Sequence, residues 1–152
     1  MQNSVNWYFQ AIDSQLGINR VQEFLNKIEY GNQTTSSNLD LYWSDFSLKI
    51  SPLEQVTLLK KFNTNEFHLN SQNVFSVKNA IKIASTPNGN FYGKTGTGRV
   101  NGQDINGWFI GYVETSDNSY YFATNIQSDS NATGKKAFEI TSDILKKLHI
   151  WN

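Results

Sequence analysis

The sequence predicts an α+β fold in which helices come first, and an antiparallel sheet and a closing helix follow. Three observations carry this prediction. Apolar residues recur at helical spacing up to about residue 86, strand-like runs separated by turn signals occupy about 87–127, and helical spacing returns after about residue 133. Helices and strands that are segregated along the chain are typical of α+β domains. The 152 residues fit one domain.

Two helices are expected near the N-terminus. Ser4 is placed to act as the N-cap of the first helix, and Gly17 is placed to end it. The apolar stripe of this helix consists of Val5, Tyr8, Phe9, Ile12 and Leu16. A shorter second helix follows, with an apolar face made of Val21, Phe24, Leu25 and Ile28. The polar segment 33–38 is then expected to be a surface loop.

Two more helices are expected before the sheet. Ser51, Pro52 and Glu54 form a strong helix start, because Ser and Glu at this spacing make a capping box and Pro fits the first helical position. The stripe of this helix consists of Leu53, Val56, Leu59 and Phe62. A further helix is expected from about Ser71 to about Ala84, so that the helical region extends over about 1–86.

Three strands are expected after the turn signal Pro87–Asn90. They are Phe91–Gly98, the nearly continuous apolar run Gly107–Val113, and Tyr120–Ile126 behind a turn at 116–118. The closing helix is expected over about 133–148. Its apolar face consists of Ala137, Ile140, Thr141, Ile144 and Leu148.

The composition argues against several classes of function. The 13 basic and 13 acidic side chains cancel, whereas a nucleic-acid-binding domain normally carries a basic surplus. No apolar run approaches the roughly 20 residues that span a bilayer. The chain has no Cys, so disulfides and thiol catalysis are excluded, and only His68 and His149 offer an imidazole. No metal site is therefore expected.

The segment Tyr92–Gly98 is the most informative for chemistry, and three interpretations compete for it. It reads Tyr-Gly-Lys-Thr-Gly-Thr-Gly, which fits a strand that ends in a flexible glycine-rich turn. A phosphate-binding loop needs a Gly at position 88, where Asn88 stands, and a helix rather than a strand after the motif. The third interpretation is the Lys-Thr-Gly motif on the edge strand of an acyl-serine enzyme.

Each residue of this third interpretation has a chemical reason. Lys94 supplies positive charge for an anionic ligand and for a proton shuttle, and the hydroxyl of Thr95 binds a carboxylate. Gly96 leaves room for a ligand that lies along the strand, and the backbone N–H of Thr97 serves as an oxyanion-hole donor. Thr95 and Thr97 together would also hold the carboxylate and side-chain amide region of the ligand. Lys-Thr-Gly therefore predicts a ligand-binding strand.

The same interpretation predicts a companion motif, a Ser followed two residues later by Asn or Val near a helix start. Ser4 and Asn6 fit it. The Ser4 hydroxyl can relay a proton to a leaving nitrogen, and the Asn6 side chain can bind a ligand amide or a catalytic Lys. Either residue alone is explained as a helix cap or a surface polar residue. The two motifs together, in this order, favour the catalytic interpretation.

These motifs resemble the C-terminal part of a class D β-lactamase-like, penicillin-recognising domain. The matching segments are Met1–Trp7, Tyr30–Asn32, Tyr42–Trp43, Ser47–Val56, Tyr92–Gly98 and Asn106–Val113. The resemblance covers nearly the whole chain. It implies an antiparallel sheet with the C-terminal helix packed on it, together with a helical subdomain.

Within that superfamily the chain is most similar to the sensor domain of BlaR/MecR-type sensor-transducers. The discriminating residue is Asn6, because the hydrolytic class D enzymes have Val at this position. In those enzymes a carbamylated Lys activates the deacylating water, and the resemblance implies that a polar Asn6 beside that Lys favours loss of the carbamate. The acyl adduct would then persist, as suits a receptor. Trp43 matches the family Trp that hydrogen-bonds the carbamate, and a buried core Trp is the other interpretation.

The resemblance also implies parts that lie outside this sequence. The family nucleophile and carbamylated Lys belong to a Ser-x-x-Lys motif, which the resemblance places upstream of Met1. A membrane-embedded zinc protease also lies upstream in the sensors, with the sensor domain on the extracellular face of the bacterial membrane. The expected ligands are β-lactam antibiotics, and the expected reaction is acylation of the upstream Ser without efficient turnover.

Three other functions remain open from the sequence. A class D hydrolase fragment would favour Val at position 6, so Asn6 counts against it. A peptidoglycan transpeptidase fragment would share Asn6, but Tyr30–Asn32 and Trp43 count against it. A binding module without a nucleophile is the third alternative.

Overall fold

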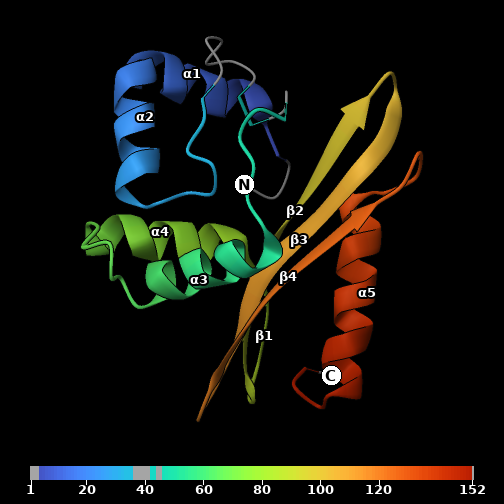
Figure 1. The fold of residues 1–152 in the computed structure, drawn as a ribbon. Helices are drawn as coiled ribbons and strands as arrows, with labels where there is room; N and C mark the ends of the chain where they lie inside the picture. Colours follow the sequence, from blue (N-terminus) through green and yellow to red (C-terminus); the bar gives the residue numbers. More distant parts are fainter. Residues whose placement is uncertain (1–3, 36–41, 44–45, 152) are drawn as a thin grey trace.

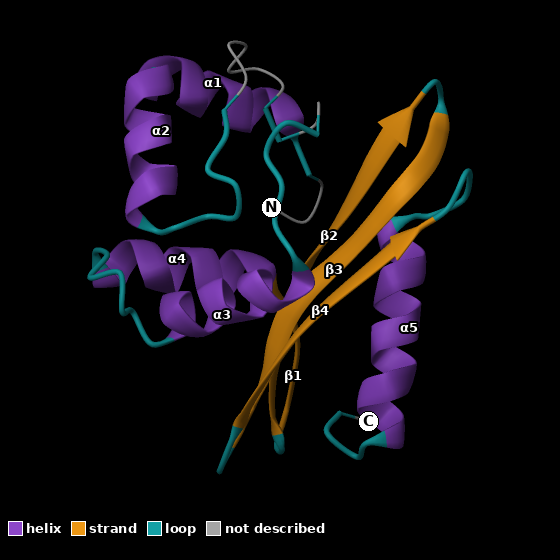
Figure 2. Cartoon of the chain, in the orientation of Figure 1, coloured by secondary structure: helices purple, strands orange, loops and turns teal. Residues whose placement is uncertain are grey.

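The chain folds into a mixed α+β structure, as predicted (Figures 1 and 2). The structure is a computed structural model, and it describes residues 4–35, 42–43 and 46–151. The helices are α1 (Asn6–Leu16), α2 (Ile18–Lys27), α3 (Pro52–Asn63), α4 (Ser71–Ile81) and α5 (Gly134–Lys147). The strands are β1 (Lys82–Thr86), β2 (Gly89–Val100), β3 (Gln103–Thr115) and β4 (Ser119–Gln127). Figure 1 shows α1–α4 on one side of the sheet and α5 on the other.

The strands form one antiparallel sheet in the order β1-β2-β3-β4. β2 and β3 pair along almost their whole length, from Gly89↔Thr115 to Val100↔Gln103. β1 is short and pairs only with the first residues of β2, where Lys82 lies opposite Tyr92. Within the described residues, β2 beyond Tyr92 is therefore paired on one side only.

The strand β1 corrects the prediction of a helix that continues to about Ala84 and of three strands. α4 ends at Ile81, and the next five residues form β1. Thr86 lies opposite Gly89, so Pro87 and Asn88 make a two-residue hairpin turn. The β-branched residues in 82–86 tolerate either structure, and pairing with β2 decides between them. Ala84 thereby packs against the core.

The main core lies between the sheet and α5. Phe91 and Phe109 meet edge to face with ring centroids 6.0 Å apart, and Phe109 is completely buried. The buried cluster consists of Phe91, Phe109, Val113, Ala137 and Leu145, with Phe122, Phe138 and Trp151 among the side chains packed around it. Burial of several aromatic side chains is the largest single source of stability in a core of this kind.

The predicted apolar face of the closing helix is partly wrong. Ala137 and Thr141 are buried as expected, and Leu145 completes the buried row. Ile140, Ile144 and Leu148 are 42%, 48% and 62% exposed. α5 carries two apolar rows, and periodicity cannot distinguish the row that faces the sheet from the row beside it.

The first helix differs from the prediction at its start. Val5 is the N-cap residue, and it makes no side-chain cap hydrogen bond. Ser4 precedes it with a positive φ of 46°. The predicted cap role of Ser4 is thus wrong, because its hydroxyl is directed to another element. Gly17, with φ +78°, ends α1 and begins α2 as expected. No residue of α1, all of which is described, is buried, and Trp7 is 70% exposed.

The third helix begins as predicted. The Ser51 hydroxyl accepts from the Glu54 backbone N–H (3.3 Å), and the Glu54 carboxylate accepts from the Ser51 backbone N–H (2.8 Å). Pro52 occupies the first helical position. Leu58 and Leu59 are buried, whereas Leu53 is 81% exposed. Over the described residues, no helix is both long and apolar enough to cross a membrane.

Candidate active site

Lys94 and Ser4 meet although 90 residues separate them in the sequence. The Lys94 Nζ donates to the Ser4 Oγ over 2.6 Å and to the Thr95 carbonyl oxygen over 2.7 Å. The turn before α1 and the middle of β2 thus converge at one point. The two motifs that the sequence analysis paired are in direct contact.

The environment of Lys94 favours loss of its proton. Burial lowers the pKa of the Lys94 ammonium, because a charged group is poorly solvated there. None of the ion pairs found among the described residues includes Lys94, so no carboxylate offsets this effect. A lysine of lowered pKa that is hydrogen-bonded to a serine hydroxyl can take and return a proton through that hydroxyl.

The two faces of β2 separate the motif residues. Cross-strand partners point to the same face of a sheet. Thr95 lies opposite Phe109, which is in the core beneath α5, whereas Lys94 lies opposite Ile110 and Gly96 opposite Trp108. Lys94, Gly96 and Trp108 therefore share the face turned away from α5. The register thus assigns Phe109 to the core and Trp108 to the side of Lys94.

Thr95 and Thr97 lie on the α5 side of β2. The Thr97 Oγ1 accepts a hydrogen bond from the Gly134 backbone N–H at 2.9 Å. A Cβ on Gly134 would come within 3.0 Å of the Thr95 Cβ. Both threonines are nevertheless exposed, because β2 is a sheet edge at this point. Their predicted contacts with a ligand remain a prediction.

Gly96 has open space in front of it. A Cβ placed there would touch only the Trp108 Cβ, at 3.8 Å. The edge of β2 next to it carries no strand partner within the described part of the chain. An unpaired edge of this kind can accept an extended ligand as an added strand. The local geometry thus fits the role predicted for Gly96.

Asn6 and Trp43 both lie in the described part of the chain, and their assigned roles stay predictions. Asn6 is the first residue of α1 and is exposed. Trp43 is half-buried, and its ring lies edge to face on Tyr42, with centroids 5.1 Å apart. Residues 36–41 and 44–45 around it lie outside the described residues. The Trp43 ring thus packs against the side chain of Tyr42.

Tyr42 connects this segment to α1. Its hydroxyl donates to the Asp13 carboxylate over 3.4 Å. Burial raises the pKa of Tyr42 to about 12, with the negative charge of Asp13 as a further cause. Burial also raises the pKa of Asp13, although the hydrogen bond from Tyr42 opposes this shift. No local sequence signal connects residues 13 and 42, so the sequence analysis missed Asp13.

The segment Tyr30–Asn32 connects the end of the α2 region to the segment that precedes α3. The Asn32 side chain donates to the Ser47 carbonyl oxygen (2.8 Å) and accepts from the Lys49 N–H (2.9 Å). Gly31 has φ +50°, and a Cβ there would overlap the Lys49 carbonyl oxygen. Tyr30 donates to Gln55 on α3 (3.2 Å). These residues position the chain that leads from the Trp43 segment into α3.

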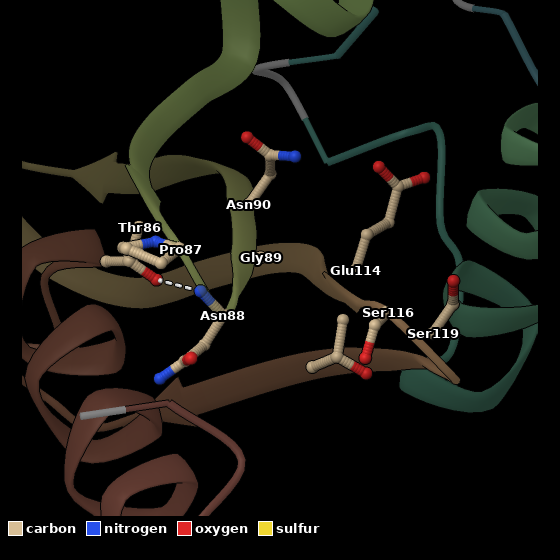
Figure 3. Close-up of a pocket in the computed structure, with 9 residues that line it drawn as sticks. Thr86, Pro87, Asn88, Gly89, Asn90, Glu114, Ser116 and Ser119 are labelled. Atoms are coloured by element: carbon tan, nitrogen blue, oxygen red, sulfur yellow. Dashed lines mark hydrogen bonds between the residues drawn. The ribbon is translucent and has the colours of Figure 1, made fainter.

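Two cavities lie outside the Lys94 contact. One of about 500 Å³ lies between the β1–β2 and β3–β4 turns (Figure 3). Its lining includes Asn88, Asn90 and Glu114, and none of the predicted site residues. A second, apolar cavity of about 470 Å³ lies between α1 and α4 and is lined in part by Val5 and Trp7. Among the described residues, no group of three or more His, Cys, Asp or Glu could hold a metal ion.

Comparison with known proteins finds a matching protein family and similar regulatory proteins. The model of the penicillin binding protein transpeptidase domain matches residues 1–146. The methicillin resistance mecR1 protein of Staphylococcus aureus is 43% identical over 150 residues, which cover 99% of this chain and 26% of that protein. The regulatory protein BlaR1 of Bacillus licheniformis is 46% identical over 151 residues, covering 99% of this chain and 25% of that protein.

The solved structures agree. The C-terminal domain of the Bacillus licheniformis BlaR penicillin-receptor matches with a TM-score of 0.95 and 45% identity, over 100% of this chain and 61% of that chain. A class D β-lactamase from Bacillus subtilis matches with a TM-score of 0.91 and 37% identity, over 100% of this chain and 62% of that chain. The chain thus spans about a quarter of the regulators and about three-fifths of the solved domains.

Proposed function

This chain belongs to the penicillin binding protein transpeptidase family, and we propose that it is the C-terminal part of a domain that senses β-lactam antibiotics. It is homologous to the sensor domains of BlaR1 and MecR1, and its fold matches that of the BlaR receptor domain. The observation that carries the proposal is the contact between Lys94 and Ser4, 2.6 Å long. This contact joins the two halves of a proton relay beside an open strand edge.

The proposed reaction is acyl transfer to a serine that lies outside this chain. The serine passes its hydroxyl proton to the Lys of the upstream Ser-x-x-Lys motif as its oxygen attacks the β-lactam carbonyl carbon, the carbonyl–nitrogen bond breaks, and the nitrogen takes up a proton. Ser4 relays that proton, and Lys94 supplies it and attracts the carboxylate of the antibiotic. The Thr97 N–H stabilises the oxygen on which negative charge develops. Thr95 and Thr97 hold the carboxylate and amide groups of the antibiotic, with Gly96 leaving room for it.

A persistent adduct would make the domain a receptor rather than a hydrolase. Asn6 stands at the start of α1, two residues from Ser4, and places a polar amide where the hydrolytic class D enzymes are expected to have Val. In this proposal Asn6 disfavours a carbamylated upstream Lys, whose environment also includes Trp43. The sensor relatives BlaR1 and MecR1 are 42–46% identical to this chain, against 38% for the probable β-lactamase YbxI of Bacillus subtilis.

The remaining parts of a receptor are proposed by analogy with these regulators. The complete protein would display this domain on the outer face of the bacterial membrane and would carry a membrane-embedded zinc protease that transmits the signal. The exposed apolar rows of α1 and α5 support the presence of further protein around this chain, because such rows are normally covered.

A class D β-lactamase is the second candidate, and the fold match to such enzymes favours it. One experiment separates the two. The complete domain, with its upstream serine, is mixed with benzylpenicillin, and its intact mass is followed over time. An adduct that persists for hours is expected. A rapid return to the free mass would identify a hydrolase, and no adduct at all would overturn both candidates.

A further inference from the structure

The first turn of α5 lies directly on the ligand-binding part of β2. A Cβ on Gly134, the first residue of α5, would lie 2.6 Å from the carbonyl oxygen and 3.0 Å from the nitrogen of Gly96. A Cβ on Gly107 would overlap the carbonyl oxygen of Thr133. Two glycines, one in the helix and one in β3, therefore allow this close approach. Larger side chains at either position would lift α5 off the strands.

A hydrogen bond fixes the same contact. The Gly134 N–H is one of the first-turn donors of α5, which have no partner inside the helix. It donates to the Thr97 Oγ1 (2.9 Å), while the Thr133 hydroxyl accepts from the Lys136 N–H (3.2 Å). Thr97 thus acts as a helix cap supplied by a different element. The cap therefore joins the N-terminal end of α5 to Thr97, the residue after Gly96.

This strand segment needs such a support. Beyond Tyr92, β2 is paired only with β3, and it contains Gly93, Gly96 and Gly98, which weaken a strand. The Gly96–Thr97 peptide carries the N–H assigned above to the oxyanion hole. Its position depends on β3 on one side and on α5 beneath it.

From this arrangement we propose that Gly134 and the Thr97 hydroxyl form a clamp, the Gly134–Thr97 clamp, that positions the Gly96–Thr97 peptide for acylation. Gly134 is a positioning residue, because it lies on the α5 side of β2 and acts through the strand. The effect of the clamp on acylation rests on the proposed function. The contact itself, by which α5 holds β2 in place, concerns the fold alone. It assigns the Thr97 side chain to α5 and leaves its backbone N–H to the ligand.

Two substitutions test the clamp in the complete domain. Thr97→Val removes the acceptor at nearly constant volume, and Gly134→Ala forces α5 and β2 apart. Each should lower the rate constant of acylation by benzylpenicillin about 10-fold or more, and Gly134→Ala should do so with the dissociation constant of the non-covalent complex unchanged. The double variant should lose little more than either single variant, since both break one contact. Thr97→Ser should restore the rate.

Thr141→Val is the matched control. The Thr141 hydroxyl also joins α5 to the sheet, through the Thr124 hydroxyl of β4 at 2.7 Å, but it lies away from β2. This variant should lose stability and keep its rate of acylation. A general loss of folding would affect the Thr97 and Thr141 variants alike. Equal losses of rate in both would therefore overturn the clamp.

Amide hydrogen exchange separates the clamp from the proposed function. Exchange over 93–100 should be faster in Thr97→Val and Gly134→Ala than in the unsubstituted domain. If the variants exchange faster but the domain forms no adduct with benzylpenicillin, the clamp contact between α5 and β2 is supported and the proposed function is rejected. Unchanged exchange, additive losses in the double variant, or a weaker non-covalent complex in Gly134→Ala would reject the clamp.

Discussion

The Lys94 Nζ donates a hydrogen bond to the Ser4 Oγ over 2.6 Å, and the two residues contact each other directly. Ser4 has a positive φ, and its hydroxyl accepts from Lys94 of β2, so the residue that was predicted to cap α1 contacts the strand instead. α1 has no side-chain cap at its N-cap residue Val5, and such a cap is worth about 1 kcal/mol in other helices. The hydroxyl of Ser4 is thus engaged by Lys94, as the proton relay proposed for this pair requires.

Ser4→Ala should slow acylation of the complete domain by about 100-fold, because a positioned proton donor contributes at least that factor. Stopped-flow measurement of acylation by a chromogenic cephalosporin gives the rate. Ser14→Ala, at an exposed position of α1, is the control and should leave the rate unchanged. Equal rates for Ser4→Ala and the unsubstituted domain would remove Ser4 from the relay.

Asn6→Val should shorten the lifetime of the acyl adduct, because an apolar side chain near the upstream Lys favours its carbamylated form. Intact mass spectrometry after removal of excess antibiotic measures the lifetime. The control is Asn19→Val, an exposed asparagine at the second position of α2. If the lifetime of the Asn6 variant equals that of the control, Asn6 has no part in adduct persistence.

The Tyr42 hydroxyl should make the fold sensitive to alkali. The folded state raises the pKa of Tyr42 from 10.0 to about 12, so between these values the folded protein holds a proton that the unfolded chain releases. Stability from this group is complete below pH 10 and falls as the pH rises toward about 12.

Urea midpoints measured from pH 9 to about 12 test this dependence. They should fall less steeply in Tyr42→Phe than in the unsubstituted chain. Tyr8→Phe, at a 53% exposed tyrosine of α1, is the control and should keep the original slope. A Tyr42 variant with the original slope would contradict the assignment.

Gly31→Ala should be strongly destabilising. Its φ of +50° is costly for a residue with a Cβ, and that Cβ would overlap the Lys49 carbonyl oxygen. Gly102→Ala is the matched control, since φ is +78° there and a Cβ would meet nothing within 4 Å. We expect Gly102→Ala to cost about 1 kcal/mol and Gly31→Ala about 3 kcal/mol or more in urea denaturation. Equal losses would mean that the loop moves freely away from Gly31.

Local signals in the sequence predicted what local interactions decide. The capping box of Ser51 and Glu54 involves only four residues, and it formed as expected. The pairing of Ser4 with Lys94 was also predicted, but only because two motifs matched a known family, since nothing in their spacing brings them together. Spacing also predicted the three long strands, whose ends differ from the structure by a few residues.

The failures concern features that tertiary contacts decide. Residues 82–86 became a strand because β2 was available to pair with them, and the buried face of α5 is the one that packs on the sheet through Ala137 and Leu145. Asp13 and Gly134 carry no local signal. Their roles follow from partners that lie 29 and 37 residues away, at Tyr42 and Thr97.

The exposed row of Ile140, Ile144 and Leu148 on α5 has a calorimetric consequence. Apolar surface that is already exposed to solvent in the folded state adds nothing to the heat capacity change of unfolding, because unfolding does not change its hydration. A longer form of the protein that covers this row will therefore unfold with a larger heat capacity change per residue. The stability of such a longer form will depend more steeply on temperature. The hydrophobic contact between its additional residues and α5 will weaken on cooling.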